Sequence, residues 1–186
     1  MTETPRPHRQ RVGDDALVAG TDKTWAQWFA LLDAAGAVGW THTDIAAWLV
    51  GEQGVDAWWA QGITVGFEQE RGLRLPGQNP DGTFSTTVSK TLSVAQADAL
   101  RLAVAALTEL AGDPASVNTE AKYASARWHL DDGARLEAMA APTTNGKCRV
   151  SLTAANLSGP EAFEGWRPRL KALLEGLATR LAAAGD

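Results

Sequence analysis

The chain has 186 residues, of which 45% are hydrophobic and 21% are charged, and its formal net charge at pH 7 is -5. This is an ordinary globular composition, and it excludes a largely disordered chain. The negative charge opposes binding to a nucleic-acid backbone unless a local basic patch overcomes it. No apolar run reaches the roughly 18 residues that a membrane-spanning helix needs. We therefore expect a cytoplasmic protein with neither a nucleic-acid nor a membrane partner.

The side chains that commonly bind metals or form disulfides are scarce. The single cysteine, Cys148, cannot form an intrachain disulfide, and we expect it to be a small buried thiol. The three histidines are too scattered to give the spacing of a zinc site. The sequence also has no nucleophile with a base beside it and no phosphate-binding loop. We predict no catalytic residue, no metal and no cofactor.

Composition divides the chain into four segments. Residues 1–20 hold arginines and a histidine but no apolar segment of the kind found in a secretory signal, and we interpret them as a flexible tail. Residues 76–82 are dense in proline, glycine and asparagine, which is typical of a linker. A helical unit is predicted over residues 21–75, and a second unit over residues 83–186.

Tryptophan is concentrated in the helical unit. Six of the eight tryptophans fall within residues 21–75, which is more indole than a helical unit needs, so they must be buried or used in binding. They are Trp25, Trp28, Trp40, Trp48, Trp58 and Trp59.

Two capping boxes place helices in this unit. Thr24 precedes Gln27 by three positions, and Thr41 precedes Asp44 in the same way. In each pair the hydroxyl can accept a hydrogen bond from a first-turn amide while the second side chain reaches back. They predict a helix from Thr24 to about residue 35 and another from Thr41 to about residue 51.

A third helix is predicted to start near Val55, and Gly62 and Gly66 on it leave room for the close approach of another element. Helix, short turn and helix is also the outline of a DNA-binding helix-turn-helix. Residues 25–75, however, carry six acidic residues against two arginines, a formal charge of -4. This charge would repel phosphates, so we do not expect DNA binding.

His42 stands at the start of the second predicted helix. A functional interpretation would make it a proton donor in an aromatic pocket. We interpret it instead as a surface histidine in the first turn of the helix.

The second unit begins with alternating apolar and hydroxyl side chains over residues 83–92, a pattern typical of a strand with one buried face. Ser93 and Gln96 then have capping-box spacing and predict a helix that Gly112 ends. Alternation returns over residues 123–130 and predicts a second strand.

Turn chemistry and face pattern together predict a meander of strands. At residues 131–133 a three-residue loop keeps Trp128 opposite Leu136, whereas a two-residue loop would place Glu137 beside the core. The same reasoning applies at residues 144–146. The remaining predicted pairs are Ala126 with Ala138, Arg127 with Glu137, Ala138 with Leu152 and Ala140 with Val150.

A long helix is predicted at the end of the chain. Ser158 and Glu161 have capping-box spacing, and a leucine-rich stripe begins at Trp166. Pro168 would clash with the carbonyl four residues earlier in a continuous helix, so we expect a break or kink near Gly165. The leucine stripe must lie across the sheet.

Two resemblances add to these patterns. The tryptophan spacing from Lys23 to Val55 resembles a small bacterial domain of unknown function. The segment from Arg127 to Leu136, followed by Gly165-Trp166 and a leucine-rich helix, resembles the SRPBCC or START-like (helix-grip) superfamily. The nearest branch is the bacterial relatives of the activator of the heat-shock chaperone ATPase. The resemblance implies an α+β fold, with an antiparallel sheet of about four strands packed against a long C-terminal helix.

The helix-grip resemblance also implies a ligand site between the sheet and the C-terminal helix. Compared with the family, this chain lacks several strands between its first helix and the strand at residues 123–130, so part of the cavity wall is missing. Either the helical unit covers the exposed sheet edge, or two subunits share their sheets in a homodimer. The candidate ligand-binding residues are Trp128, Leu136, Val150, Leu152, Trp166 and Leu170, together with Trp58 and Trp59 of the helical unit.

The leading functional hypothesis is a non-enzymatic binding protein for an apolar or aromatic small molecule. A protein-interaction or chaperone-accessory module is the main alternative, because aromatic residues favour interfaces. A cyclase-type enzyme and a DNA-binding protein are the remaining, weaker hypotheses.

Overall fold

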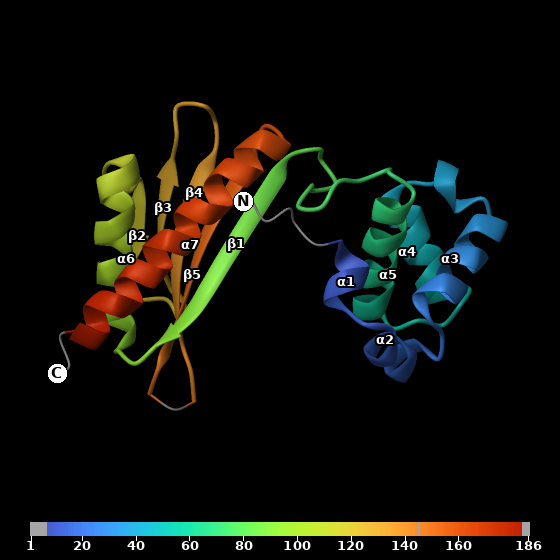
Figure 1. The fold of residues 1–186 in the computed structure, drawn as a ribbon, viewed down its shortest axis with the longest axis horizontal. Coiled ribbons are helices and arrows are strands. Elements are labelled where there is room, and N and C mark those ends of the chain that lie inside the picture. The colour runs from blue at the N-terminus through green and yellow to red at the C-terminus, as the bar shows by residue number, and fades with distance from the viewer. Residues whose placement is uncertain (1–6, 145, 184–186) are drawn as a thin grey trace. The chain divides into compact units, whose positions relative to one another are not determined.

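The computed structural model describes residues 7–144 and 146–183, and the fold is α+β (Figure 1). These residues divide into two compact units, one ending at Pro80 and the other starting at Asp81. The first unit is helical, and the second holds a five-stranded antiparallel sheet with two helices. Among the described helices, none combines the length and apolar character needed to span a membrane.

The N-terminal unit contains five α-helices and one short 3-10 turn within its described residues. Its elements are α1 (His8–Arg11), α2 (Asp14–Thr21), α3 (Trp25–Ala34), η1 (Ala37–Gly39), α4 (His42–Gly51) and α5 (Ala57–Glu70).

The structure confirms both capping boxes of this unit. Thr24 Oγ1 accepts from the amide of Gln27, and Thr41 Oγ1 accepts from the amide of Asp44. In each box the second side chain also accepts from the backbone amide of the threonine, so two otherwise unpaired donors are satisfied at each helix start. The third helix starts at Ala57 with Asp56 as its cap, two residues after the predicted position.

The prediction of a flexible tail is wrong for residues 8–20. They form α1 and the greater part of α2, and Leu17 is fully buried in the core of the unit. The Asp14 carboxylate accepts from the backbone amide of Trp25 at 2.9 Å, and the Val12 carbonyl accepts from the Trp25 indole N–H at 2.8 Å. These contacts join residues more than ten positions apart in the sequence. Composition alone does not reveal them, so it indicated an unstructured segment.

The C-terminal unit follows the predicted order of strand, helix, meander and helix. Its elements are β1 (Phe84–Leu92), α6 (Gln96–Ala111), β2 (Ser116–Asn118), β3 (Ala124–His129), β4 (Arg135–Pro142), β5 (Cys148–Leu157) and α7 (Pro160–Ala183). The strands lie in the order β1-β5-β4-β3-β2, so the meander returns β5 to the side of β1.

The strand registers confirm the predicted loop at residues 131–133. Trp128 pairs with Leu136, and Arg127 pairs with Glu137 through an ion pair of 2.9 Å. Gly133 has a φ of 84°, a backbone conformation that is strained for any residue with a side chain. The pairs Ala126–Ala138, Ala138–Leu152 and Ala140–Val150 are also as predicted.

Two features of the sheet were not predicted from the sequence. β2 adds a fifth strand, which is only three residues long and entirely exposed. In β5 the register to β1 shifts between Ala154 and Leu157, where Asn156 has a φ of 61°. This bulge turns Leu157 into the core, where strict alternation would have placed its side chain on the opposite face.

Two predicted features of the helices in this unit are absent: a capping box at the start of α6 and a break in α7. The Ser93–Gln96 capping box does not form, because α6 begins at Gln96 without a side-chain cap. The side-chain amide of Gln96 donates instead to the backbone carbonyls of Lys122 and Ala140. α7 runs through Pro168 without a break at Gly165. Phe163 and Leu170 on either side of the proline are both buried, so packing outweighs the lost backbone hydrogen bond. Gly112 ends α6 as predicted.

Both helices pack on the same face of the sheet (Figure 1): α7 lies on β1 and β5, and α6 lies on β3, β4 and β5. The core between them contains the inward-facing residues of β3, β4 and β5, with Leu100 and Leu107 from α6 and Leu170, Leu174 and Leu177 from α7. Arg127, Arg149 and Thr153 line the opposite face, where polar side chains meet solvent.

Trp128 tests this core. Its side chain is 1% exposed, and its indole N–H donates to the Gly112 carbonyl at 2.9 Å. We expect Trp128→Ala to lower the free energy of unfolding by about 3–5 kcal/mol, measured by urea denaturation. Tyr123→Ala, at an aromatic residue that is 48% exposed, is the control and should change it by less than about 0.5 kcal/mol. Equal effects would contradict this core.

Candidate functional site

The residues predicted to line a pocket under α7 lie in the core of the C-terminal unit or at its edge. Trp166 is half-buried at the edge of this cluster, with the Arg169 guanidinium 5.6 Å from its ring. The other five are at most 1% exposed: Trp128, Leu136, Val150, Leu152 and Leu170. In this structure these five side chains pack in the core between the sheet and the two helices.

A groove of about 340 Å³ does lie between α6 and α7. None of the predicted site residues lines it. Its walls are Ala106, Glu109, Leu110, Arg169, Ala172, Leu173, Gly176 and Leu177.

The remaining two predicted site residues, Trp58 and Trp59, lie in the N-terminal unit and line a second hollow. We call this hollow the indole pocket, and its volume is about 250 Å³. Most of its wall is apolar, and the polar groups of its side chains are one imidazole, one amide and three indole N–H groups. The lining residues are His8, Val12, Trp25, Trp58, Trp59, Gln61, Gly62 and Val65.

Two glycines hold two of the indoles in place. A methyl group added at Gly66 would lie 2.5 Å from Trp25 Cζ3, and one added at Gly20 would lie 2.2 Å from Trp59 Cε2. Real Cβ atoms do not approach so closely, so each ring rests on bare backbone. The expectation that Gly66 permits a close approach is therefore confirmed, and the ring it admits belongs to Trp25.

Trp58 forms the exposed part of the pocket. It occupies the first turn of α5, is 69% exposed, and meets the Trp59 ring edge-on with the centroids 4.7 Å apart. Its backbone amide donates to the Asp56 cap, so the local backbone is fixed while the indole remains in solvent. An exposed indole beside a mostly apolar hollow is typical of a binding surface.

His8 supplies a polar group to the same pocket. Its ring meets Trp25 edge-on at 6.0 Å, and Arg11 donates to its Nδ1 at 3.3 Å. Partial burial lowers the pKa of His8 below its ordinary value, and the positive charges of Arg11 and Arg74 lower it further. The imidazole is therefore neutral at pH 7.

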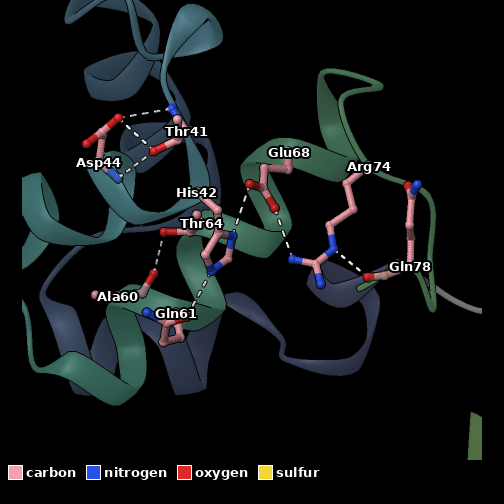
Figure 2. A network of polar contacts seen from close by, with 9 residues as sticks. All are labelled: Thr41, His42, Asp44, Ala60, Gln61, Thr64, Glu68, Arg74 and Gln78. Carbon is pink, nitrogen blue, oxygen red and sulfur yellow. Dashed lines mark hydrogen bonds and ion pairs between the residues drawn. The ribbon is translucent and has the colours of Figure 1, made fainter. Parts of the chain in front are cut away.

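Gln61 connects the indole pocket to a polar network (Figure 2). Its side-chain oxygen lies 2.9 Å from His42 Nε2, while His42 Nδ1 lies 3.0 Å from a Glu68 carboxylate oxygen. The other Glu68 oxygen accepts from Arg74 at 3.1 Å, and Arg74 in turn donates to the Gln78 carbonyl at 2.6 Å. The interpretation of His42 as a simple surface histidine is therefore wrong.

This network is structural in character. The Glu68 side chain is only 11% exposed, yet it pairs with both His42 and Arg74, so no buried charge is left without a partner. It ties the start of α4 and the loop after α5 to α5 itself, which keeps the helix that carries Trp58 and Trp59 in place.

The described residues contain no group of three or more histidine, cysteine or acidic side chains that could hold a metal ion. Burial raises the pKa of the Cys148 thiol, which makes it a poor nucleophile and agrees with the expected buried thiol. What the arrangement can do is remove an apolar surface from water and offer it a few hydrogen-bonding groups.

Comparison of the chain with protein-family models, with curated proteins and with solved structures finds no match.

Sequence reasoning found part of this site. The store of indoles singled out Trp58 and Trp59, and the spacing of Gly62 and Gly66 indicated a close contact. It missed His8 and Val12, because they come from a segment without apolar periodicity that is ordered by contacts with α3 and α5.

Gly66→Ala tests the contact between the Trp25 ring and the backbone of Gly66. In an open helix this change stabilises by about 1 kcal/mol, but here the methyl would displace the Trp25 ring, so we expect a net loss of about 1–3 kcal/mol. Gly51→Ala, at a helical glycine of the same unit with no atom within 4 Å, is the matched control and should cost nothing. Tryptophan fluorescence during urea unfolding measures both, and a stabilised Gly66 variant would contradict the contact.

His8 makes the stability of the N-terminal unit depend on pH. Because its pKa is lowered in the folded state, the unfolded chain binds the proton more tightly. The stability that the neutral His8 side chain contributes is fully present above the ordinary histidine pKa of about 6.5 and is lost as the pH falls below it. Urea unfolding at about pH 7.5 and pH 5 should show a smaller loss in His8→Phe than in the unsubstituted protein. An equal loss would contradict this.

Proposed function

We propose that the protein is a non-enzymatic binding protein that holds a small apolar or aromatic molecule in the indole pocket. The observation that supports this most directly is the exposed Trp58 indole, which stands next to Trp59 over a pocket whose other walls are fixed. A solvated indole of this size contributes little to folding, whereas covering it with an apolar ligand would be favourable.

The pocket is prepared for binding before a ligand arrives. Trp25 and Trp59 rest on glycine backbone, and the Trp25 indole N–H is held by the Val12 carbonyl. Their rings have little side-chain freedom left to lose on binding, which lowers the entropic cost of association. Only Trp58 would have to be ordered by the ligand.

This proposal moves the ligand from the position that the helix-grip resemblance implied. The helix-grip superfamily assignment itself stays a prediction. The C-terminal unit would, on this view, be a supporting unit whose packed core carries no ligand.

Trp58→Ala tests the proposal. With naphthalene as the probe and indole N–H resonances as the readout, we expect the signals of Trp25, Trp58 and Trp59 to shift, while those of Trp128 and Trp166 stay in place. Because Trp58 is 69% exposed, Trp58→Ala should weaken binding at least about tenfold and lower the stability by less than about 1 kcal/mol.

Tyr123→Ala provides the control for this experiment, because it removes an exposed aromatic ring of the other unit and should leave binding unchanged. The proposal fails if naphthalene shifts none of the eight indole resonances. Shifts confined to Trp128 and Trp166 would return the ligand to the space between the sheet and α7.

A protein-interaction module is the second candidate. It is favoured by the nine-residue strand β1, which stands at one end of the strand order and, among the strands that the structure describes, is adjacent to β5. Pairing of two β1 edges would give the predicted homodimer, and the mass in solution by light scattering distinguishes a dimer from a monomer.

A further inference from the structure

The polar chemistry of the indole pocket limits what it can hold. Arg11 carries no acceptor, so the contact between its guanidinium and His8 Nδ1 requires Nδ1 to accept. In the neutral imidazole the proton must then be on Nε2. Among the described residues Nε2 has no hydrogen-bond partner, and it lies 3.1 Å from the position that a Cβ of Gly62 would take. His8 lines the pocket, and a side chain at Gly62 would crowd this N–H donor.

The charges around the pocket disfavour a cation. Aromatic walls of this kind can bind quaternary ammonium groups, but such sites gain from a nearby carboxylate. None of the eight described lining residues is acidic, and Arg11 and Arg74 lie close enough to lower the pKa of His8. A positive ligand beside His8 would meet these two guanidinium charges.

The volume sets the size of the ligand. An apolar cavity of about 150 Å³ holds a single benzene ring. At about 250 Å³ the indole pocket has room for a second fused ring, but not for a drug-sized molecule. The rings of Trp58 and Trp59 are nearly perpendicular, at 83°, so a flat ligand can stack on one of them while its edge meets the face of the other.

We infer that the indole pocket takes an uncharged, planar, two-ring aromatic molecule whose ring nitrogen or carbonyl oxygen accepts a hydrogen bond from His8 Nε2. This inference rests on the proposed function and adds to it the chemical class of the ligand and a residue that determines specificity. Beside the indole N–H groups of Trp58 and Trp59, His8 contributes a directional donor to the lining, whereas the orientation of the Gln61 amide depends on the tautomer of His42.

Three probes of one shape separate the contributions: naphthalene, which has no acceptor, quinoline, which has one, and N-methylquinolinium, which has a fixed positive charge and no acceptor. Binding is measured at about pH 8 by the shifts of the indole resonances. We expect the unsubstituted protein to bind quinoline at least as tightly as naphthalene, although desolvating the ring nitrogen has a cost. N-methylquinolinium should bind most weakly.

Two variants assign the preference to His8. His8→Phe keeps a ring beside Trp25 but removes the donor, and Gly62→Ala places a methyl against Nε2 while favouring the helix. In each, the ratio of quinoline affinity to naphthalene affinity should fall about fivefold, as expected for the loss of one hydrogen bond. Gly62→Ala keeps the test valid should His8→Phe fail to fold.

The outcomes separate this inference from the function on which it rests. If naphthalene binds and the affinity ratio is the same in both variants as in the unsubstituted protein, the role of His8 is wrong and the apolar pocket stands. Tighter binding of N-methylquinolinium than of quinoline would identify a cation site and overturn the inference. If none of the three probes binds, the inference and the proposed function fail together.

Discussion

The contact between the Trp25 ring and the bare backbone of Gly66 is the constraint on which the N-terminal unit depends. It brings α3 against α5 more closely than any side chain at that position would allow. The backbone amide of Trp25 donates to the Asp14 carboxylate and its indole N–H donates to the Val12 carbonyl, so this residue also holds Val12 and Asp14 in place. The contact of Trp25 with Gly66 therefore places the Trp25 ring and the adjacent His8 side chain in the wall of the indole pocket.

Hydrogen bonds and ion pairs then fix the orientation of α5, which packing alone would leave adjustable. α5 carries most of the pocket, and its orientation is held by Glu68, which shares its carboxylate between His42 and Arg74 (Figure 2). Each of these side chains is at least partly buried and each has its partner, so the network adds directional restraint without leaving an unpaired charge. The unit thus combines a frame of buried and hydrogen-bonded side chains with the exposed indole of Trp58.

The main constraint in the C-terminal unit is different. Buried and exposed side chains alternate along the strands of a sheet that helices cover on one face. Because both α6 and α7 cover the same face, every inward residue of β3, β4 and β5 is small or apolar, and the bulge at Asn156 restores this rule for Leu157. The bulky inward residues of this unit, among them Trp128 and Leu136, are therefore buried in its core.

Local patterns in the sequence determined the α+β class, the capping boxes at Thr24 and Thr41, and the strand registers on either side of Gly133. Each depends on residues only a few positions apart or on a strict two-residue period, so short-range chemistry is sufficient. The tertiary structure alone decided that α1 and α2 form, that α7 continues through Pro168, and that the apolar residues under α7 are buried in a core whereas Trp58 and Trp59 line a hollow. These outcomes depend on long-range packing, in which Trp25 meets Gly66 and Phe163 and Leu170 are buried on either side of a proline, and no local pattern encodes which apolar surfaces fill completely and which leave a space.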